Sequence, residues 1–389
     1  MEIDKTDEGY LTRLVEAPDG AGSARFILPL SEQDLDQLWS TVERRRELDP
    51  SEQRRIARMM GERLFGALFA GEVGAAYRNS MRSAYQSRTS LCVRLDLSQA
   101  PRLSHLPWEF LFDSQTNEFL TLSVHTPLVR HLDLMHQVEA IPVQPPLRVL
   151  AVVAEPDTYA RFDGQRKWYD LVDSIDSLAR EKRLLVEKLA KPSLFELQRR
   201  LRQDKFHVLH FIGHGIDNPL TEDGQLVFED EIRRGRTVSG LHLGTLLRDH
   251  YPLRLAILQS CDDFADGIRH NPFAQVAQNM VLRQVPAAIA LPQSLAREET
   301  MHFLHALYGG LAGYRPIAAA VTDARNALYR FNQGIEWGLP LLYSRAPNGY
   351  LFDDGSLVRP AAVTTQREPS LWERVMQMGR NRPDPPRDQ

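Results

Sequence analysis

Two short stretches of the chain end in residues that can perform nucleophilic chemistry together. FHVLHFIGHG, residues 206–215, runs from a strand-like apolar segment into His214, which is flanked by two glycines. LRLAILQS, residues 253–260, runs directly into Cys261. A thiol attacks carbonyl carbons once a base removes its proton, and imidazole is the side chain most often used as that base. If the two strands are neighbours, the sequence predicts a Cys/His dyad for acyl transfer.

The two glycines beside His214 fit this chemistry. We expect Gly213 and Gly215 to let a substrate backbone approach the imidazole and to let the chain turn with unrestricted φ. The backbone N–H of Gly215, together with that of Cys261, is expected to form an oxyanion hole for a tetrahedral intermediate. One such donor is typically worth about 3 kcal/mol.

A metal site is an alternative interpretation of this histidine-rich stretch. His207, His210 and His214 fall within eight residues. On a strand, however, His207 and His214 point to opposite faces, and no cysteine or carboxylate cluster completes a zinc site. A phosphate loop of the GxxxxGK[ST] type is also absent from the sequence. We therefore expect no metal and no cofactor, and we expect His210 to be a hydrogen-bonded core histidine.

The elements that must position the dyad follow an α/β pattern. Four short, continuously apolar segments, LRVLAVVA, FHVLHFIG, LRLAILQS and VPAAIALP, alternate with helical patterns after the PVQPP linker. Strands that are buried on both faces and separated by helices predict a mainly parallel sheet with helices on each side. In such sheets reacting groups gather at the carboxyl ends of the strands. Both members of the predicted dyad fall at such ends.

The segment before that linker has a mixed α and β pattern. Two apolar runs around the turn PDGAGS predict a strand pair between Tyr10 and Leu30. Ser31 and Ser51 are expected to cap the two helices that follow. The alternating LCVRLDL, residues 91–97, predicts a strand with one wet face.

We divide the chain into three parts. Residues 1–144 form the mixed N-terminal region, which is expected to pack on the core. Residues 145–358 form the core, in which the turn at Asn348-Gly349 predicts a hairpin. Residues 359–389 form a tail that is expected to be partly disordered, because its end, GRNRPDPPRDQ, is polar and proline-rich.

Composition limits the partners and the compartment. The 47 basic and 51 acidic residues give a net charge of −4, which offers no broad field for nucleic acid or an anionic membrane. No apolar run approaches the roughly 18 residues of a spanning helix, and the acidic N-terminus is unlike an export signal. The sequence has only two cysteines, which speaks against a disulfide framework. We expect a cytoplasmic protein that binds neither nucleic acid nor membrane.

The spacing of the two site residues is typical of caspases. In this sequence 47 residues separate His214 from Cys261, close to the roughly 50 between the caspase His and its Q-A-C-x-G nucleophile. HFIGHG followed by LQSCD resembles the CHAT family, the bacterial caspase-like domains. LPWEFLFD, VPAAIALP and WGLPLLYSRAPNG resemble other blocks of that family. The resemblance covers about residues 90–355.

The resemblance implies a cysteine endopeptidase with His214 and Cys261 as the dyad, and with Gly215 and Cys261 as oxyanion donors. Many relatives act in bacterial defence, including antiviral defence, by cleaving a protein partner. We expect a protein substrate and a partner or ligand that activates the enzyme. The alternatives are a catalytically silent CHAT-fold interaction or scaffold module, and a domain that binds a small molecule at the same sheet edge.

Substrate choice depends on residues around the cysteine. Gln259, two residues before it, is a candidate to line the pocket for the residue that precedes the cut. Asp262 and Asp263 would favour a basic residue there, but Asp262 could instead cap the segment that follows the strand. The basic cluster at residues 232–236 is expected to be a solvated loop, with a self-processing site or a regulatory loop as the alternative.

Overall fold

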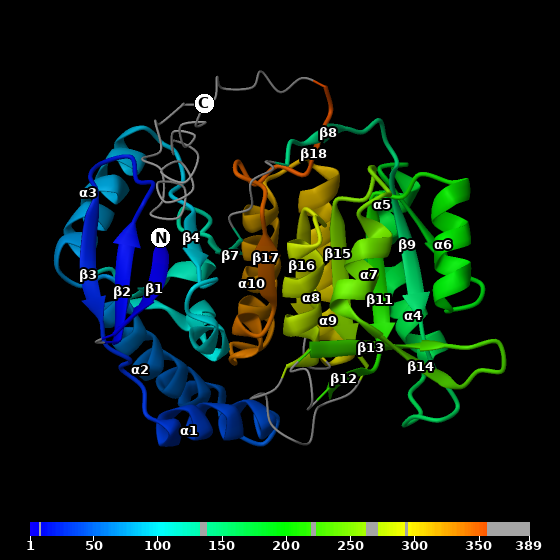
Figure 1. Ribbon diagram of the computed structural model, residues 1–389, viewed down its shortest axis with the longest axis horizontal. Coiled ribbons are helices and arrows are strands. Elements are labelled where there is room, and N and C mark those ends of the chain that lie inside the picture. The colour runs from blue at the N-terminus through cyan, green and yellow to red at the C-terminus, as the bar shows by residue number, and fades with distance from the viewer. Residues whose placement is uncertain (8, 133–137, 219–222, 262–270, 292–294, 356–389) are drawn as a thin grey trace, which may run out of the picture. The chain divides into compact units, whose positions relative to one another are not determined.

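The structure, a computed structural model, is built around one large sheet (Figure 1). Its strands are β1 (Glu2–Thr6), β2 (Gly9–Leu14), β3 (Gly22–Phe26), β4 (Val93–Asp96), β7 (Leu128–His131), β9 (Leu147–Val153), β10 (Leu184–Lys188), β11 (Val208–Gly213), β15 (Leu255–Ser260), β16 (Ala287–Leu291) and β17 (Leu341–Ser344). They lie in the order β10-β9-β11-β15-β16-β17-β7-β4-β1-β2-β3. The first five are parallel, and β17 is antiparallel to β16. This arrangement confirms the predicted mainly parallel α/β sheet.

Coordinates are described for residues 1–7, 9–132, 138–218, 223–261, 271–291 and 295–355. Met1–Asp354 forms one compact unit, and strands from both sides of position 144 belong to its main sheet. The predicted tail, residues 359–389, lies outside the described residues.

Helices cover both faces of the central strands because each strand is apolar on both sides. In β9, Val149, Ala151 and Val153 belong to one apolar core, whereas Leu150 and Val152 belong to a second core. The first core includes side chains of α4 (Gly164–Ser174), α5 (Asp176–Arg180), α9 (Arg297–Ala312) and α10 (Ile317–Asn332). The second includes side chains of α6 (Leu194–Gln203), α7 (Gly240–Leu247) and α8 (Pro272–Leu282). The helical layers on the two faces are as predicted.

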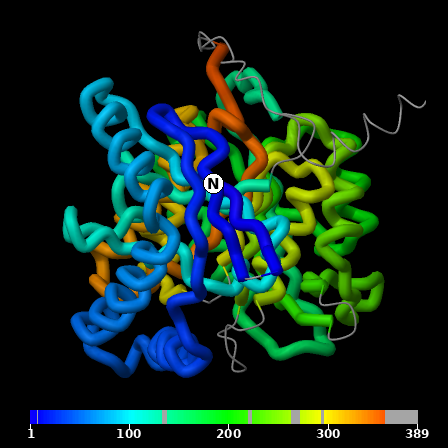
Figure 2. Tube along the Cα trace, turned by 60° about the vertical axis from the view of Figure 1, so that its left-hand side comes forward, coloured from blue at the N-terminus to red at the C-terminus, as the bar shows by residue number. Residues whose placement is uncertain are grey.

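The N-terminal region combines a strand meander with three helices, α1 (Glu32–Glu43), α2 (Pro50–Leu68) and α3 (Gly71–Gln86). β2 and β3 form the predicted antiparallel pair, and Figure 2 shows β1–β3 side by side at the front of that view. Ser31 caps α1 as predicted. The cap of α2 is Asp49 and not the predicted Ser51, which lies in the first turn and donates its N–H to the Asp49 carboxylate.

Short elements complete the described chain. They are β5 (Phe112–Asp113), β6 (Glu118–Phe119), β8 (Ile141–Pro142), β12 (Gly215–Asn218), β13 (Asp223–Glu229), β14 (Gly235–Ser239), β18 (Phe352–Asp353) and the 3-10 turns η1 (Pro101–His105), η2 (Trp108–Phe110), η3 (Leu120–Leu122) and η4 (Glu336–Gly338). β12, β13 and β14 form a small antiparallel sheet that begins directly after His214. Among the described residues, no helix has the length and the apolar character needed to cross a membrane.

The hairpin predicted at Asn348-Gly349 is wrong. A turn is present, and Gly349 takes a positive φ of 71°. The strands on either side of it do not pair with each other, because β17 lies between β16 and β7 whereas β18 pairs with β8.

Candidate active site

His214 and Cys261 lie side by side at the carboxyl edge of the central sheet. β11 and β15 are parallel neighbours, and their register pairs Gly213 with Ser260. The next residue of each chain segment is therefore one member of the predicted pair. Cys261 Sγ lies 3.4 Å from His214 Nδ1, and both side chains are buried. A sulfur–nitrogen hydrogen bond of this kind allows direct proton transfer.

The loop after β9 fixes the orientation of the imidazole. His214 Nε2 lies 2.7 Å from the carbonyl oxygen of Ala160. Since a carbonyl only accepts hydrogen bonds, Nε2 carries the proton, and in the neutral ring Nδ1 then presents its lone pair to the thiol. The rings of Tyr159 and Phe162 pack against the imidazole at centroid distances of 5.5 and 5.7 Å. Sequence patterns did not identify this loop, because the group that matters is a backbone oxygen.

The two predicted oxyanion donors differ in their hydrogen bonding. Hydrogen-bonded and non-hydrogen-bonded pairs alternate along antiparallel strands. The Val227 N–H donates to His214 O at 3.0 Å, so His214 and Val227 form a hydrogen-bonded pair. The next pair, Gly215 with Leu226, is therefore non-hydrogen-bonded, and the Gly215 N–H points away from β13. The Cys261 N–H donates to Gly213 O at 3.1 Å. The second predicted donor is therefore already occupied by a backbone acceptor.

Both glycines beside His214 are packed closely against aromatic rings. A Cβ on Gly213 would lie 2.8 Å from the ring of Phe211, and a Cβ on Gly215 would lie 2.5 Å from the ring of Phe273. Neither glycine has a positive φ. The predicted need for unrestricted φ is therefore wrong, and the absence of a Cβ is what these positions use.

Gln259 is buried and hydrogen-bonded. Its Oε1 lies 3.0 Å from His210 Nε2, while His210 Nδ1 lies 2.8 Å from the hydroxyl of Tyr308 in α9. Burial lowers the pKa of His210 to about 4, so the ring is neutral, donates from Nε2 and accepts the tyrosine proton. A small hollow beside Gln259 is lined by Leu291, Leu295, Thr300, Phe303 and Leu304. Asp262 and Asp263 lie outside the described residues.

The other histidine of the motif has a separate structural role. His207 Nδ1 accepts the Arg148 N–H at 2.9 Å, and burial lowers the pKa of His207 to about 4. The His207 side chain thus takes the place of a backbone acceptor for Arg148, at the end of β11 opposite to His214. His207, His210 and His214 serve three different partners and do not converge on one point.

Comparison with known protein families identifies the chain. The CHAT domain family matches residues 58–380. The chain belongs to the CHAT-domain family. This match begins before and ends after the block resemblance described above, so it takes in α3 and the carboxyl-terminal part of α2. Comparison with curated proteins returned no match.

Solved structures similar to this CHAT-domain chain include two classes of protein. Two crystal structures of the Saccharomyces cerevisiae separase–securin complex, both 11% identical, have TM-scores of 0.36 and 0.35 over 66% of this chain. They match over 16% and 15% of the separase chain, so this CHAT-domain chain spans a small part of that relative's length. The Arg-specific cysteine proteinase gingipain R is 9% identical, with a TM-score of 0.39 over 84% of this chain and 80% of the gingipain chain.

The LPWEFLFD block of this CHAT domain supplies a buried ion pair. Glu109 receives two hydrogen bonds from Arg130, at 2.9 and 2.7 Å, and both side chains are at most 5% exposed. Burial disfavours the charge of the guanidinium, but the facing carboxylate outweighs it and raises the pKa of Arg130. Arg130 also donates to the carbonyls of Ser104 and Leu106. All of these contacts join the 104–110 segment to β7.

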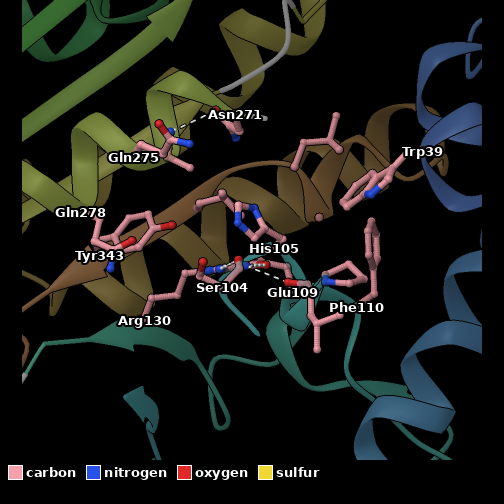
Figure 3. A pocket seen from close by; sticks show the side chains of 16 residues that line it. Trp39, Ser104, His105, Glu109, Phe110, Arg130, Asn271, Gln275, Gln278 and Tyr343 are labelled. Atoms are coloured by element: carbon pink, nitrogen blue, oxygen red, sulfur yellow. Dashed lines mark hydrogen bonds and ion pairs between the residues drawn. The ribbon is translucent and has the colours of Figure 1, made fainter. Parts of the chain in front are cut away.

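This ion pair borders a cavity of about 60 Å³, enough for a few water molecules (Figure 3). Trp39, His105 and Tyr343 contribute to its walls, as do Asn271, the N-cap of α8, and Gln275 within α8. Neither member of the predicted dyad lines this cavity. It is a feature of the sheet–helix packing and is separate from the candidate active site.

Proposed function

We propose that this CHAT-domain protein is a caspase-like cysteine endopeptidase that cleaves a protein substrate with His214 and Cys261. The observation that supports it most is the directed chain of groups from Cys261 Sγ to His214 Nδ1 at 3.4 Å and from His214 Nε2 to Ala160 O at 2.7 Å. An imidazole held in this tautomer can accept a thiol proton without first rotating.

The proposed reaction proceeds in two stages. Cys261 passes its proton to Nδ1 of His214, and the thiolate forms a bond to the scissile carbonyl carbon. The Gly215 N–H stabilises the oxyanion, the C–N bond breaks, and the leaving amine takes the proton from Nδ1. In the second stage water gives a proton to Nδ1 while its oxygen replaces sulfur on the acyl carbon, and Cys261 recovers its thiol.

We further propose that the enzyme is latent until a regulatory protein or a ligand acts on the site. The Cys261 N–H donates to Gly213 O, so it becomes an oxyanion donor only when that bond is shared or broken. Conformational completion of an active site is a common form of control. The family resemblance supports a role in bacterial defence or another regulated-proteolysis pathway, in the reducing cytoplasm where a thiol stays active.

The proposed substrate contacts are those on either side of the nucleophile. Gln259 and Asp262 are proposed to line the pocket for the residue that precedes the cut. The Gln259 oxygen is held by His210, so substrate contacts by this side chain would come from its amide N–H groups. Asp262 would add a charge that favours a basic residue.

Cleavage profiling by mass spectrometry tests the proposal. Wild type, Cys261→Ala and His214→Ala are incubated with a proteome-derived peptide mixture, with and without proteins encoded beside this one. We expect new termini with wild type only. Cys92→Ala is the matched control, since Cys92 is the other cysteine of the chain. This variant should cleave like wild type.

Retention of cleavage by Cys261→Ala would refute the proposal. Absence of cleavage with every partner, combined with partner binding that neither substitution changes, would favour the silent scaffold.

A further inference from the structure

Three groups that contact the His214 ring belong to one loop, residues 155–163, here called the histidine loop. It contributes the Ala160 carbonyl that accepts the Nε2 proton. It also contributes the rings of Tyr159 and Phe162, the first inclined at 30° to the imidazole and the second at 80°. The position of the imidazole therefore depends on what holds this loop.

A second segment, residues 230–235, runs from the end of β13 to the first residue of β14 and holds the histidine loop through its backbone groups. We call this segment the basic turn. The Asp157 N–H donates to the carbonyl of Arg233 at 2.9 Å. The Gly235 N–H donates to Thr158 Oγ1 at 2.8 Å. These two bonds lie on residues that directly precede Tyr159 and Ala160.

The basic turn is itself internally fixed. One carboxylate oxygen of Asp230 accepts the N–H groups of Ile232 and Arg234 at 2.9 and 2.8 Å. The Asp230 N–H in turn donates to Arg234 O at 2.8 Å. Such side-chain-to-backbone bonds give a turn a defined shape. A turn of defined shape can therefore fix the position of the histidine loop that it contacts.

Further contacts close the same interface. Glu229, the last residue of β13, accepts the Glu155 N–H at 2.9 Å. The guanidinium of Arg233 donates to Glu155 O at 3.3 Å and lies 3.7 Å from the Asp157 carboxylate. The Arg233 side chain is 60% exposed, so its ion pair contributes little by itself. The backbone and Glu229 contacts are the main attachment.

Gly235 places the turn directly against a ring that touches the imidazole. A Cβ on Gly235 would lie 2.3 Å from Cε2 and 2.7 Å from Cδ2 of Tyr159. Real side chains do not approach that closely, so any larger residue must move the tyrosine ring. Tyr159 is the ring that lies tilted by 30° against His214.

We propose that the basic turn is a positioning element for the catalytic histidine, with Gly235 of the turn and Thr158 of the histidine loop as the positioning residues. It acts through the histidine loop on the His214–Ala160 hydrogen bond. The basic cluster expected from the sequence to be a solvated loop thus has its backbone directed inward, toward the site. This inference rests on the proposed function for its kinetic consequence, but its structural part is measurable without turnover.

The structural test is NMR of protein labelled with ¹⁵N-histidine. In wild type the His214 Nε2 proton is hydrogen-bonded and should exchange slowly with water. Gly235→Ala should make that exchange faster by about tenfold, the factor that corresponds to one lost hydrogen bond. Gly66→Ala is the matched control, because a Cβ there meets nothing within 4 Å, and it should behave like wild type.

A milder pair of variants keeps the test decisive if Gly235→Ala fails to fold. Thr158 is exposed, so Thr158→Val removes the acceptor of the Gly235 N–H with little effect on packing, and Thr158→Ser restores it. We expect faster Nε2 proton exchange in the valine variant and wild-type exchange in the serine variant. Wild-type exchange in a folded Thr158→Val variant would overturn the proposal.

Kinetics separate this proposal from the proposed function. If the wild type cleaves a substrate, Thr158→Val should lower kcat by about 10- to 100-fold and leave KM unchanged, since a displaced imidazole affects chemistry more than binding. If kcat is unchanged in that variant, the positioning role is refuted while the protease survives. If wild type cleaves with none of the partners tested and partner binding is independent of the dyad, but the exchange effect is present, the proteolytic function fails and the structural coupling stands.

Discussion

Acid is predicted to destabilise this protein through His210. The ring is fully buried between Gln259 and Tyr308. Burial is the main cause of its lowered pKa, and the hydrogen bond to Gln259 opposes it only in part. In the unfolded chain the same ring takes a proton near pH 6.5. As pH falls below that value, the unfolded state gains a proton that the folded state does not accept.

The magnitude follows from the two pKa values. Each pH unit between about 6.5 and 4 removes up to about 1.4 kcal/mol of unfolding free energy per such histidine. For His210, with a folded pKa of about 4, the loss approaches about 3 kcal/mol and ends below pH 4, where both states are protonated. A loss of this size is a large fraction of the 5–15 kcal/mol that is typical of a folded domain.

Urea denaturation at a series of pH values between 7 and 4 measures this loss. His210→Gln removes the titrating ring and should flatten the decline by about 3 kcal/mol over that range, even though the lost hydrogen bonds lower its stability at pH 7. His302→Gln makes the same change at an exposed position and should leave the wild-type pH dependence in place. Parallel declines of wild type and His210→Gln would refute the reasoning.

Two further substitutions test other contacts of the fold and the site. Glu109→Gln leaves the Arg130 guanidinium buried without its counter-charge and should lower the free energy of unfolding, measured by urea denaturation, by about 3–5 kcal/mol. Glu109→Leu combined with Arg130→Met should lower it by less. A loss below about 1 kcal/mol for the single variant would contradict this reasoning. Gly215→Ala places a Cβ 2.5 Å from the Phe273 ring and should lower the cleavage rate by about 10- to 100-fold. Phe273→Leu should partly restore that rate, and equal rates for Gly215→Ala and wild type would show that the close contact is not needed.

Local sequence patterns predicted the secondary-structure elements correctly where no other residue or strand could take the same place. The apolar runs of the central strands were buried on both faces, which is a property of the strands themselves. Ser51 is a common cap residue, but Pro50 favours the first helical position and so places the cap at Asp49. A turn is present at Asn348-Gly349, but the flanking strands pair with other strands, β17 with β16 and β18 with β8.

The sequence by itself determined that His214 and Cys261 end two strands of a parallel sheet, because continuously apolar runs mark strands that are buried on both faces, and the helical patterns between them indicate parallel connections. The 3.4 Å between Cys261 Sγ and His214 Nδ1 also requires that β11 and β15 be neighbours in the observed register and that the imidazole be held in its orientation. Tertiary structure alone decided which backbone oxygen accepts the histidine proton, and that the Cys261 N–H is held by Gly213. Every residue has a carbonyl and nearly every residue has an N–H, so no residue type marks the ones that matter. The packing of the histidine loop selects the Ala160 carbonyl, and the pairing of β11 with β15 selects the Cys261 N–H.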